Sequence, residues 1–473
     1  MEVTRKPQLH QDWIDSHAYG IVKALQKGGF TTYLVGGCVR DLLLGIHPKD
    51  FDIATAAHPP QVKRTIHMAF VIGKRFRLVL VKRDDQQFEV ATFRREANAE
   101  EVEDEMPASD NLFGTPEEDA RRRDFTFNAL FYDPVSEQLI DYVNGLQDIE
   151  DRIIRMIGDP ATRLREDPIR IMRALRLSHK LNCRIEPLLR EAIRDNAGEL
   201  ARSVLPRRRE EILKILRLDD PEACLMEAFD LGILEHVLPG LHALLLQEEK
   251  RDAFLSNFRA YQGAFQKAAP KGADTFHLFG WLVFSMFQAA VGVDEAGRAV
   301  DIQEDERFVA LMRDELGMHK MEQTSVANAI YLLPSLRKTD DFTRRGERRQ
   351  FAFLNNEGFP LALTLADAEH WVSGHELGFW RQALAKMQPE LEAAAEELRG
   401  KRRRPRRRRP RGGGDERRPN GGRGPAGDES GDESGDDADD LDEDDATDLD
   451  DRLAEEAEAA HGHDADARGP ARN

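Results

Sequence analysis

Short blocks of apolar and polar residues at the start of the chain predict strands and helices of a mixed domain. Residues 33–35 form an apolar run that ends at two glycines, and residues 39–44 follow with helical spacing. Gly45 can end that helix in a left-handed conformation. Residues 51–55 then alternate as a strand does. The stretch 33–55 is therefore predicted to run strand, glycine turn, short helix and strand.

The segments around this stretch extend the predicted domain. Residues 13–28 have apolar positions at helical spacing, and Pro59-Pro60 suits the first turn of another helix. Residues 70–82 and 88–93 run apolar or alternate on either side of an Asp84-Asp85 turn, which predicts a hairpin. Together these elements predict a small mixed sheet flanked by helices.

The rest of the chain has a different pattern. Beyond residue 182 it predicts helix after helix to about residue 398, with almost no strand signal. Residues 275–293 are nearly long enough to span a bilayer, but polar residues and glycines interrupt them, so we expect a buried core helix. Residues 97–113 lack periodicity and predict a mobile loop.

Composition fits a protein of several domains. The chain has 473 residues, of which 40% are hydrophobic, enough for more than one core. Cys38, Cys183 and Cys224 have neither disulfide nor metal-site spacing, which favours a reducing compartment. Residues 1–13 lack the apolar core of a signal peptide, so we expect a cytoplasmic location and no membrane association.

The net charge of −19 is distributed unevenly. Residues 401–411, KRRRPRRRRPR, hold nine positive and no acidic residues, whereas residues 415–473 hold 22 acidic and six basic ones. This composition cannot form a packed core, so the tail is expected to be disordered. The arginine run is the strongest polyanion site in the sequence. We hypothesise that the acidic tail competes with RNA for it, so deletion of residues 428–451 should tighten RNA binding.

Three acidic residues near the glycine turn are candidates for metal binding. Asp50 and Asp52 are two residues apart, so an extended chain would point both to one face, about 6.5 Å apart. Like charges this close require a cation, and two divalent ions are the usual arrangement in nucleotidyl transfer. Glu89 lies in an apolar strand and must face water, a cation or a metal. Solvated carboxylates on an exposed strand are the alternative.

The glycine turn itself is a candidate phosphate site. Gly36 and Gly37 carry no Cβ, so backbone N–H groups at the helix start can approach a phosphate closely. Arg40 supplies a charged donor nearby. An ordinary tight turn is the alternative interpretation.

Two further polar patterns lie downstream. Residues 117–130, EEDARRRDFTFNAL, are expected to form a helix on which Asp124 and Asn128 share a face, with Arg121 one turn before them. A solvated charged helix face is the alternative.

The second pattern is Glu166-Asp167-x-x-Arg170. We expect one helical turn between Asp167 and Arg170, so that a carboxylate and a guanidinium can meet one base edge. An intrahelical ion pair is the alternative.

In this order, GGCVRDLLLG, KDFDIAT, RRDFTFNAL and the EDxxR pattern closely resemble the motifs of the class II nucleotidyltransferases, the family of bacterial poly(A) polymerases and tRNA CCA-adding enzymes. The resemblance covers most of the first two hundred residues. It implies an α+β nucleotidyltransferase head at 1–158 and an all-α neck with a base-recognition motif at 159–240. A helical RNA-binding body at 241–399 and a disordered tail at 400–473 would follow.

The resemblance also implies roles for the candidate residues. Asp50 and Asp52 would bind two Mg²⁺ ions, with Glu89 as the third carboxylate. The residues that would hold the nucleotide are Gly36, Gly37, Arg40, Arg123, Asp124, Asn128, Asp167 and Arg170.

The implied activity is template-independent addition of AMP from ATP to RNA 3′ ends, with CCA addition to tRNA as the alternative. Residues 73–78, GKRFRL, and the arginine tail resemble bacterial poly(A) polymerases and favour the first. Residues 342–353, FTRRGERRQFAF, resemble the arginine-rich region of these polymerases, and cations with nearby aromatic faces suit single-stranded RNA. A solvated helix face is the alternative. The expected partners are RNA 3′ ends, ATP and unidentified RNA-decay proteins. An RNA-binding scaffold with a decayed transferase head is an alternative from another class. It predicts loss of the carboxylates or the glycine turn, and all are present.

Overall fold

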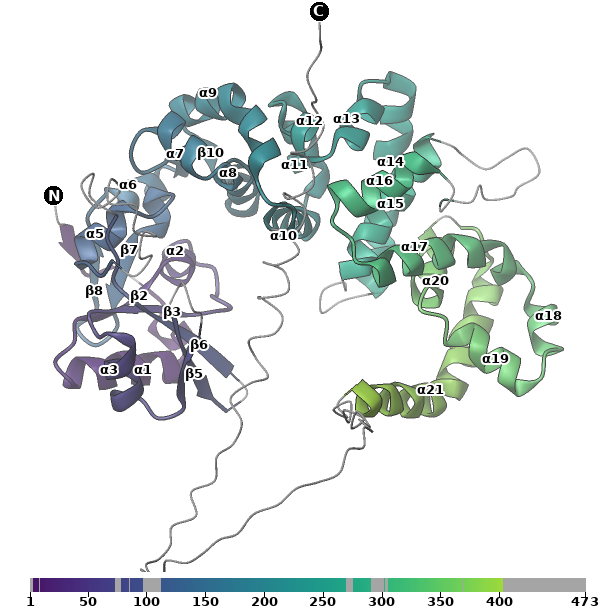
Figure 1. Ribbon diagram of the computed structural model, residues 1–473, viewed down its shortest axis with the longest axis horizontal. Helices are drawn as coiled ribbons and strands as arrows, with labels where there is room; N and C mark the ends of the chain where they lie inside the picture. Colours follow the sequence, from purple (N-terminus) through teal and green to yellow (C-terminus); the bar gives the residue numbers. More distant parts are fainter. Residues whose placement is uncertain are drawn as a thin grey trace, which may run out of the picture. The chain divides into compact units, whose positions relative to one another are not determined.

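An eight-stranded mixed sheet organises the N-terminal part of the chain (Figure 1). The strands lie in the order β1-β8-β7-β2-β3-β6-β5-β4, and all neighbours are antiparallel except β3 and β6. They are β1 (Val3–Arg5), β2 (Thr32–Val35), β3 (Asp52–Thr55), β4 (Ala69–Ile72), β5 (Leu78–Arg83), β6 (Gln86–Thr92), β7 (Leu130–Asp133) and β8 (Gln138–Asp141). The predicted mixed sheet flanked by helices is confirmed.

The structure is a computed structural model. It describes residues 3–7, 9–72, 78–84, 86–96, 112–268, 275–290, 302, 305–368 and 370–402. Most of the predicted loop, the basic residues that follow Ile72, and the arginine-rich and acidic tail beyond Arg402 lie outside these ranges.

One face of the sheet is covered by helices. Leu34, Ile53, Val79 and Val90 point to this face and are at most 1% exposed, in one cluster with residues of α1 (Ser16–Lys27) and α3 (Pro59–Thr65). Figure 1 draws both helices beside the strands they contact. On the opposite face, Val35, Ala54, Phe131 and Ile140 of the central strands form a second buried cluster with Ala120 of the segment after β6, so only part of that face is open.

The ends of the first two helices follow from local sequence. Asp15 caps α1 by accepting hydrogen bonds from the backbone N–H groups of His17 and Ala18, at 2.7 and 3.1 Å. The next helix, α2 (Gly37–Leu43), is followed by Gly45 with a φ of +71°, as predicted for a left-handed helix end.

Short elements complete the N-terminal part and lead into the helices that follow. A parallel pair of short strands joins β9 (Ile153–Ile154) to β10 (Arg184–Ile185). The helices are α5 (Pro116–Arg121), α6 (Gly145–Glu150), α7 (Pro160–Glu166), α8 (Ile169–Leu181), α9 (Pro187–Asn196), α10 (Leu205–Leu216), α11 (Pro221–Asp230), α12 (Ile233–Val237) and α13 (Pro239–Leu245).

The remaining described residues are helical, as predicted. The helices are α14 (Glu248–Ala268), α15 (Thr275–Ala290), α16 (Glu306–Ala310), α17 (Lys320–Leu332), α18 (Thr339–Thr343), α19 (Glu347–Leu354), α20 (Phe359–Ala368) and α21 (Gly374–Arg402). Short 3₁₀ helices lie at Gln11–Trp13, Thr126–Asn128, Ala197–Arg202 and Leu333–Arg337, and a π turn at Leu311–Glu315.

The apolar helix α15 is a core helix, as expected. Residues Leu278 through Phe287 are all buried, and Trp281 stacks on Phe258 of α14 with ring centroids 4.1 Å apart. Within the described ranges, no helix combines the length and hydropathy that crossing a membrane requires.

Candidate active site

The chain turns at Gly36, between β2 and α2, in a conformation that favours glycine. Its φ is +74°, where a side chain would be strained. A Cβ at Gly36 would lie 3.5 Å from both Asp52 Oδ2 and Arg123 Nη1. The predicted glycine turn is therefore present, and its bare backbone leaves room between a carboxylate and a guanidinium.

Asp52 and Glu89 lie side by side on neighbouring strands. Asp52 is the first residue of β3 and pairs with Val35, the last residue of β2. On its other side, β3 runs parallel to β6, and Ile53 lies opposite Val90. The preceding residues of the two strands, Asp52 and Glu89, therefore lie beside each other. Both residues are exposed, and the strand geometry points them to the same face. Two of the three predicted carboxylates thus meet on one face.

The pKa of the Asp52 carboxyl is raised from its ordinary value. Desolvation is the largest cause and the negative charge of Glu89 the next, while Arg123 acts in the opposite direction and Asp50 adds a smaller upward shift. Asp52 nevertheless keeps an exposed surface, so water and ligands still reach the carboxylate. A cation that relieved the repulsion would lower the pKa of Asp52 toward its ordinary value.

The sequence led us to expect Asp50 in an extended segment with Asp52, but Asp50 lies outside the strand. β3 begins at Asp52, and Asp50 belongs to the segment before it. Asp50 lines a polar hollow of about 760 Å³ together with Asp12, Lys49 and Gln87, and Asp52 is not part of that lining. Asp50 and Asp52 are both exposed with buried Phe51 between them, and the charge of Asp50 raises the pKa of Asp52, so their common face stays a prediction although β3 starts at Asp52.

The donor chemistry of the site fits Mg²⁺. Mg²⁺ is commonly held by one or two carboxylates together with substrate phosphates and water, and Asp52 and Glu89 supply two carboxylates on one face. Within the part of the chain that the structure describes, no three His, Cys, Asp or Glu side chains are grouped closely enough to enclose an ion. Asp50 lies close enough for its charge to act on Asp52 and would supply the third carboxylate.

Arg40 is a buried positive charge beneath the glycine turn. It is 5% exposed, its Nη1 donates to Asn128 Oδ1 at 2.6 Å, and its Nε and Nη2 donate to Asp41 Oδ1 at 2.8 and 2.6 Å. A Cβ at Gly37 would lie 3.5 Å from Arg40 Nη2. Arg40 thus connects the glycine turn to Asn128, another of the predicted residues.

Asp119, which sequence reasoning missed, holds two arginines of the site. It is 1% exposed; its Oδ1 accepts from Arg122 Nε and Nη2 at 2.9 and 2.6 Å, and its Oδ2 accepts from Arg123 Nε and Nη2 at 3.1 and 2.9 Å. Burial opposes ionisation, but the charges of Arg123 and Arg122 outweigh it and lower the pKa of Asp119. The four-residue spacing to Arg123 is the sequence signal that could have indicated this role.

The predicted helix over residues 117–130 is wrong. α5 ends at Arg121, and only a 3₁₀ turn at Thr126–Asn128 follows before β7. The reason is that Phe125 and Phe127 are both buried, at 0 and 2% exposure. Residues two apart lie on nearly opposite sides of an α-helix, so burying both rings in one core requires a different backbone.

Asp124 and Asn128 nevertheless come together, as predicted. Asn128 Nδ2 donates to Asp124 Oδ1 at 3.4 Å. The other Asp124 oxygen lies 2.9 Å from Arg173 Nη2, on α8. Arg121 is not part of this group, because it pairs with Glu117 on the surface at 2.7 Å. The cation beside Asp124 is therefore Arg173.

Asp167 and Arg170 do not lie on one continuous helix. α7 ends at Glu166, and α8 begins at Ile169 after a break. Arg207 Nη1 and Nη2, on α10, each donate to one Asp167 carboxylate oxygen at 2.9 Å, whereas Arg170 Nε lies 4.0 Å from that carboxylate. The main partner of Asp167 is therefore Arg207, which the sequence did not indicate, since it lies forty residues further along.

Arg163 connects the segment around Arg170 to Arg122 and Arg123. It is 9% exposed, and its Nη2 donates to the backbone carbonyls of Arg122 and Arg123 at 2.7 and 3.2 Å. The Arg163 carbonyl in turn accepts from Arg170 Nη1 at 2.7 Å. A chain of contacts thus runs from Arg170 to Arg123, which faces Gly36.

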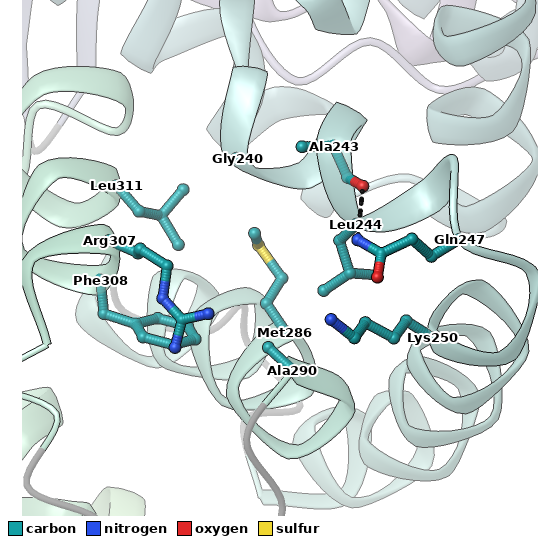
Figure 2. A pocket seen from close by; sticks show the side chains of 10 residues that line it. All are labelled: Gly240, Ala243, Leu244, Gln247, Lys250, Met286, Ala290, Arg307, Phe308 and Leu311. Atoms are coloured by element: carbon teal, nitrogen blue, oxygen red, sulfur yellow. Dashed lines mark hydrogen bonds between the residues drawn. The ribbon is translucent and has the colours of Figure 1, made fainter.

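The helical part contains a separate, mainly apolar pocket of about 270 Å³ (Figure 2). Met286, Leu311 and Leu244 line it, and Lys250 and Arg307 project toward it from α14 and α16. None of the predicted site residues lines this pocket.

Of the phenylalanines in residues 342–353, Phe342 is buried, and Phe351 and Phe353 are half-buried. Phe342 is 4% exposed and packs against Trp380 with centroids 4.9 Å apart, and Phe353 stacks on the same ring at 5.4 Å. The neighbouring Arg344 and Arg348 are exposed. Arg345 lies over the Phe353 ring, 5.3 Å from its centre, so a cation and an aromatic ring are adjacent here and contact with single-stranded RNA stays a prediction.

Comparison with protein-family models gives two matches. Residues 32–155 match "Poly A polymerase head domain", and residues 182–245 match "Probable RNA and SrmB-binding site of polymerase A".

Curated relatives include poly(A) polymerases and CCA-adding enzymes. Poly(A) polymerase I of Haemophilus influenzae is 40% identical over 246 residues, which cover 50% of this chain and 54% of that protein. The CCA-adding enzyme of Lactobacillus helveticus is 38% identical over 200 residues, which cover 42% and 49%. The chain spans about half the length of these relatives.

Among solved structures, the Bacillus stearothermophilus CCA-adding enzyme in complex with CTP is similar with a TM-score of 0.58 and 25% identity, covering 78% of this chain and 82% of that one. The likeness therefore extends from the sheet well into the helical part.

Proposed function

Since the chain carries a head domain of the poly(A) polymerase and CCA-adding enzyme family, we propose that it adds AMP from ATP to RNA 3′ ends without a template. The observation that carries this proposal is the position of Asp52, beside both the Gly36 turn and Glu89. At this position, a triphosphate bound at the glycine turn would lie next to carboxylates that are able to hold Mg²⁺.

In the proposed reaction, the primer 3′-oxygen attacks the α-phosphorus of ATP and pyrophosphate leaves. Asp52 and Glu89, joined by Asp50, would hold Mg²⁺, which neutralises charge on the reacting oxygens when bound. Arg123, fixed by Asp119, faces the space above Gly36 and would bind phosphate oxygens there. Arg40 adds positive charge from below and keeps Asn128 in place.

The remaining predicted residues would contact the sugar and the base. Asp124 and Asn128 are linked to each other and close to the phosphate-facing arginines, which suits a ribose. Arg170 and Asp167 follow on the next segment and would face the adenine. We keep the proposed division into a head at 1–158, a neck at 159–240, a body at 241–399 and a tail beyond.

The bond from Arg207 to Asp167 favours poly(A) synthesis over CCA addition. A CCA-adding enzyme must accept both cytosine and adenine, whereas Arg207 occupies both oxygens of the Asp167 carboxylate and restrains its orientation. A restrained pocket suits one base. CCA addition stays the second candidate, because relatives of both kinds have similar identities.

We assign the protein to the cytoplasm, where RNA and ATP are present. The match of residues 182–245 supports RNA contact by the neck, and we propose RNA-decay proteins as partners of the same region.

The test is to incubate the full chain and Mg²⁺ with a short oligoadenylate and each nucleoside triphosphate in turn. Long tails from ATP alone are expected, and Asp52→Asn should abolish them. Addition of two cytidines and one adenosine to tRNA lacking its CCA end, with no extension of oligoadenylate, would instead establish the second candidate. Full activity of Asp52→Asn would overturn the assignment of the site.

A further inference from the structure

A row of side chains leads from the candidate site to the edge of the sheet. Leu80 of β5 lies opposite Glu89 of β6 and also opposite Phe70 of β4, and Glu89 lies beside Asp52. Paired residues on neighbouring strands point to the same face. Asp52, Glu89, Leu80 and Phe70 therefore form one line across four strands.

This part of the face is open to solvent although it is apolar. Phe70 is 43% exposed and Ile72 42%, and Leu78 and Leu80 beside them are half-buried. β4 is the last strand in the sheet order, so one edge of it pairs with no other described strand. A strand face that contacts only water is usually polar. This face is apolar, which indicates that a partner binds it.

The charge around Phe70 indicates that the partner is anionic. Lys82 Nζ lies 5.6 Å from the centre of the Phe70 ring. Lys82 is exposed and shares this face with Leu80 and Phe70, whereas α3 covers the opposite face of the sheet. Cations interleaved with an exposed aromatic ring are the arrangement by which proteins bind single-stranded nucleic acid.

We propose that the RNA strand crosses this open face, with its 3′ end at Asp52 and a base of an upstream nucleotide stacked on Phe70. Asp52 and Phe70 are separated by three strand-to-strand gaps of about 4.8 Å, so their side chains lie roughly 14 Å apart. At about 3.4 Å per stacked nucleotide, Phe70 meets the third to fifth nucleotide from the 3′ end. Lys82 would contact a neighbouring phosphate. This inference rests on the proposed function and adds a primer-binding subsite to it.

The inference is tested with Phe70→Ala in the full chain and oligoadenylate primers of two to eight nucleotides. Base stacking on an aromatic ring contributes about 1–3 kcal/mol, so the KM for primers of five or more nucleotides should rise roughly five- to 150-fold. The KM for a dinucleotide primer and for ATP should not change, because neither reaches Phe70. Phe70→Trp keeps an aromatic face and should restore the long-primer KM.

Val71→Ala is the matched control. Val71 is 42% exposed on the same strand, but it lies opposite Val79 and points to the other face. It should leave every primer KM unchanged. If wild-type protein extends primers but Phe70→Ala has a normal KM at every length, the subsite is refuted while the proposed function stands. If wild-type protein extends no primer, the proposed function itself fails.

A second copy of the chain could also cover an open strand edge. Sedimentation of wild type and Phe70→Ala without RNA separates the two partners. A wild-type monomer is expected. A dimer that Phe70→Ala dissociates, with unaltered RNA affinity, would overturn the RNA assignment.

Discussion

Arg207 donates two hydrogen bonds of 2.9 Å to Asp167, one to each carboxylate oxygen. The two residues are forty positions apart and belong to different helices. Arg209, two residues further on α10, makes an equivalent bidentate pair with Glu322 of α17 at 2.9 and 2.7 Å. The first turns of α10 therefore bind Asp167, between α7 and α8, through one arginine and Glu322 of α17 through another.

Replacing Arg207 should reduce selectivity for ATP. Arg207→Gln releases Asp167, which can then rotate and accept a hydrogen bond from the amino group of cytosine. A hydrogen bond to a charged group is worth about 1.5–3 kcal/mol, so the ratio of kcat/KM for ATP to that for CTP should fall about tenfold or more. Arg202→Gln is the control, because Arg202 is exposed and pairs only locally with Glu199. An unchanged ratio in Arg207→Gln would exclude this role.

Gly36→Ala should inactivate the protein for a local reason. The substitution strains a residue with a φ of +74° and fills the space between Asp52 and Arg123. Gly45→Ala has the same strain, at a φ of +71°, but nothing lies within 4 Å of its Cβ. Both variants should lose about 1–2 kcal/mol of unfolding free energy, and only Gly36→Ala should lose kcat/KM for ATP, about 100-fold. Equal activities of the two variants would contradict a phosphate site at Gly36.

Asp119→Asn should weaken both the fold and nucleotide binding. It leaves Arg122 and Arg123 without the buried carboxylate that accepts four of their hydrogen bonds. Breaking a buried ion pair costs about 3–5 kcal/mol, which urea unfolding at pH 7 would measure. The KM for ATP should rise because Arg123 is no longer held toward Gly36. Glu117→Gln, which breaks an exposed pair with Arg121 only, should change neither quantity.

Glu227 should make stability depend on acid pH. Its hydrogen bond from His179, with the further bond and charge of Arg190, lowers the pKa of Glu227 from 4.5 to about 2. The folded state therefore binds this proton later than the unfolded state, so the stabilisation is complete above pH 4.5 and is lost as pH falls toward 2. Its size is on the order of 3 kcal/mol.

Urea unfolding of wild type and Glu227→Gln between pH 7 and pH 3 measures this effect. The difference in unfolding free energy between the two should shrink as pH falls. Glu235→Gln, an exposed residue of the neighbouring α12, should show no such trend. A difference that stayed constant with pH would show that the Glu227 side chain stabilises the fold by packing and not by charge.

Local signals located the parts of the site that depend on neighbouring residues. The glycine turn, the helix after it and the left-handed Gly45 follow from backbone chemistry within a few residues, and all three are present. The alternation of β6 likewise predicted that Glu89 faces away from the core, since its neighbours Phe88 and Val90 are buried. Periodicity also identified α15 as a core helix.

Other parts of the site were mistaken because distant packing decides them. Charge spacing suggested a helix through Asp124, but the burial of Phe125 and Phe127 imposed an extended backbone and a 3₁₀ turn. Asp50 precedes β3, whose pairing begins at Asp52 opposite Val35, so strand pairing does not fix the position of Asp50. The spacing of Arg121 would place it beside Asp124 on a helix, but Arg121 pairs with Glu117 on the surface.

The sequence by itself determined the mixed sheet, the helical remainder, the bare turn at Gly36 and the identity of the acidic residues, because these depend on periodicity and on residue chemistry at close range. Only the tertiary structure decided which charges meet. Asp119 with Arg123, Asp167 with Arg207, and the line from Asp52 to Phe70 each join residues brought together by helix packing or strand order. Hydrogen bonds and Coulomb forces act over a few ångströms of space, whatever the separation along the chain.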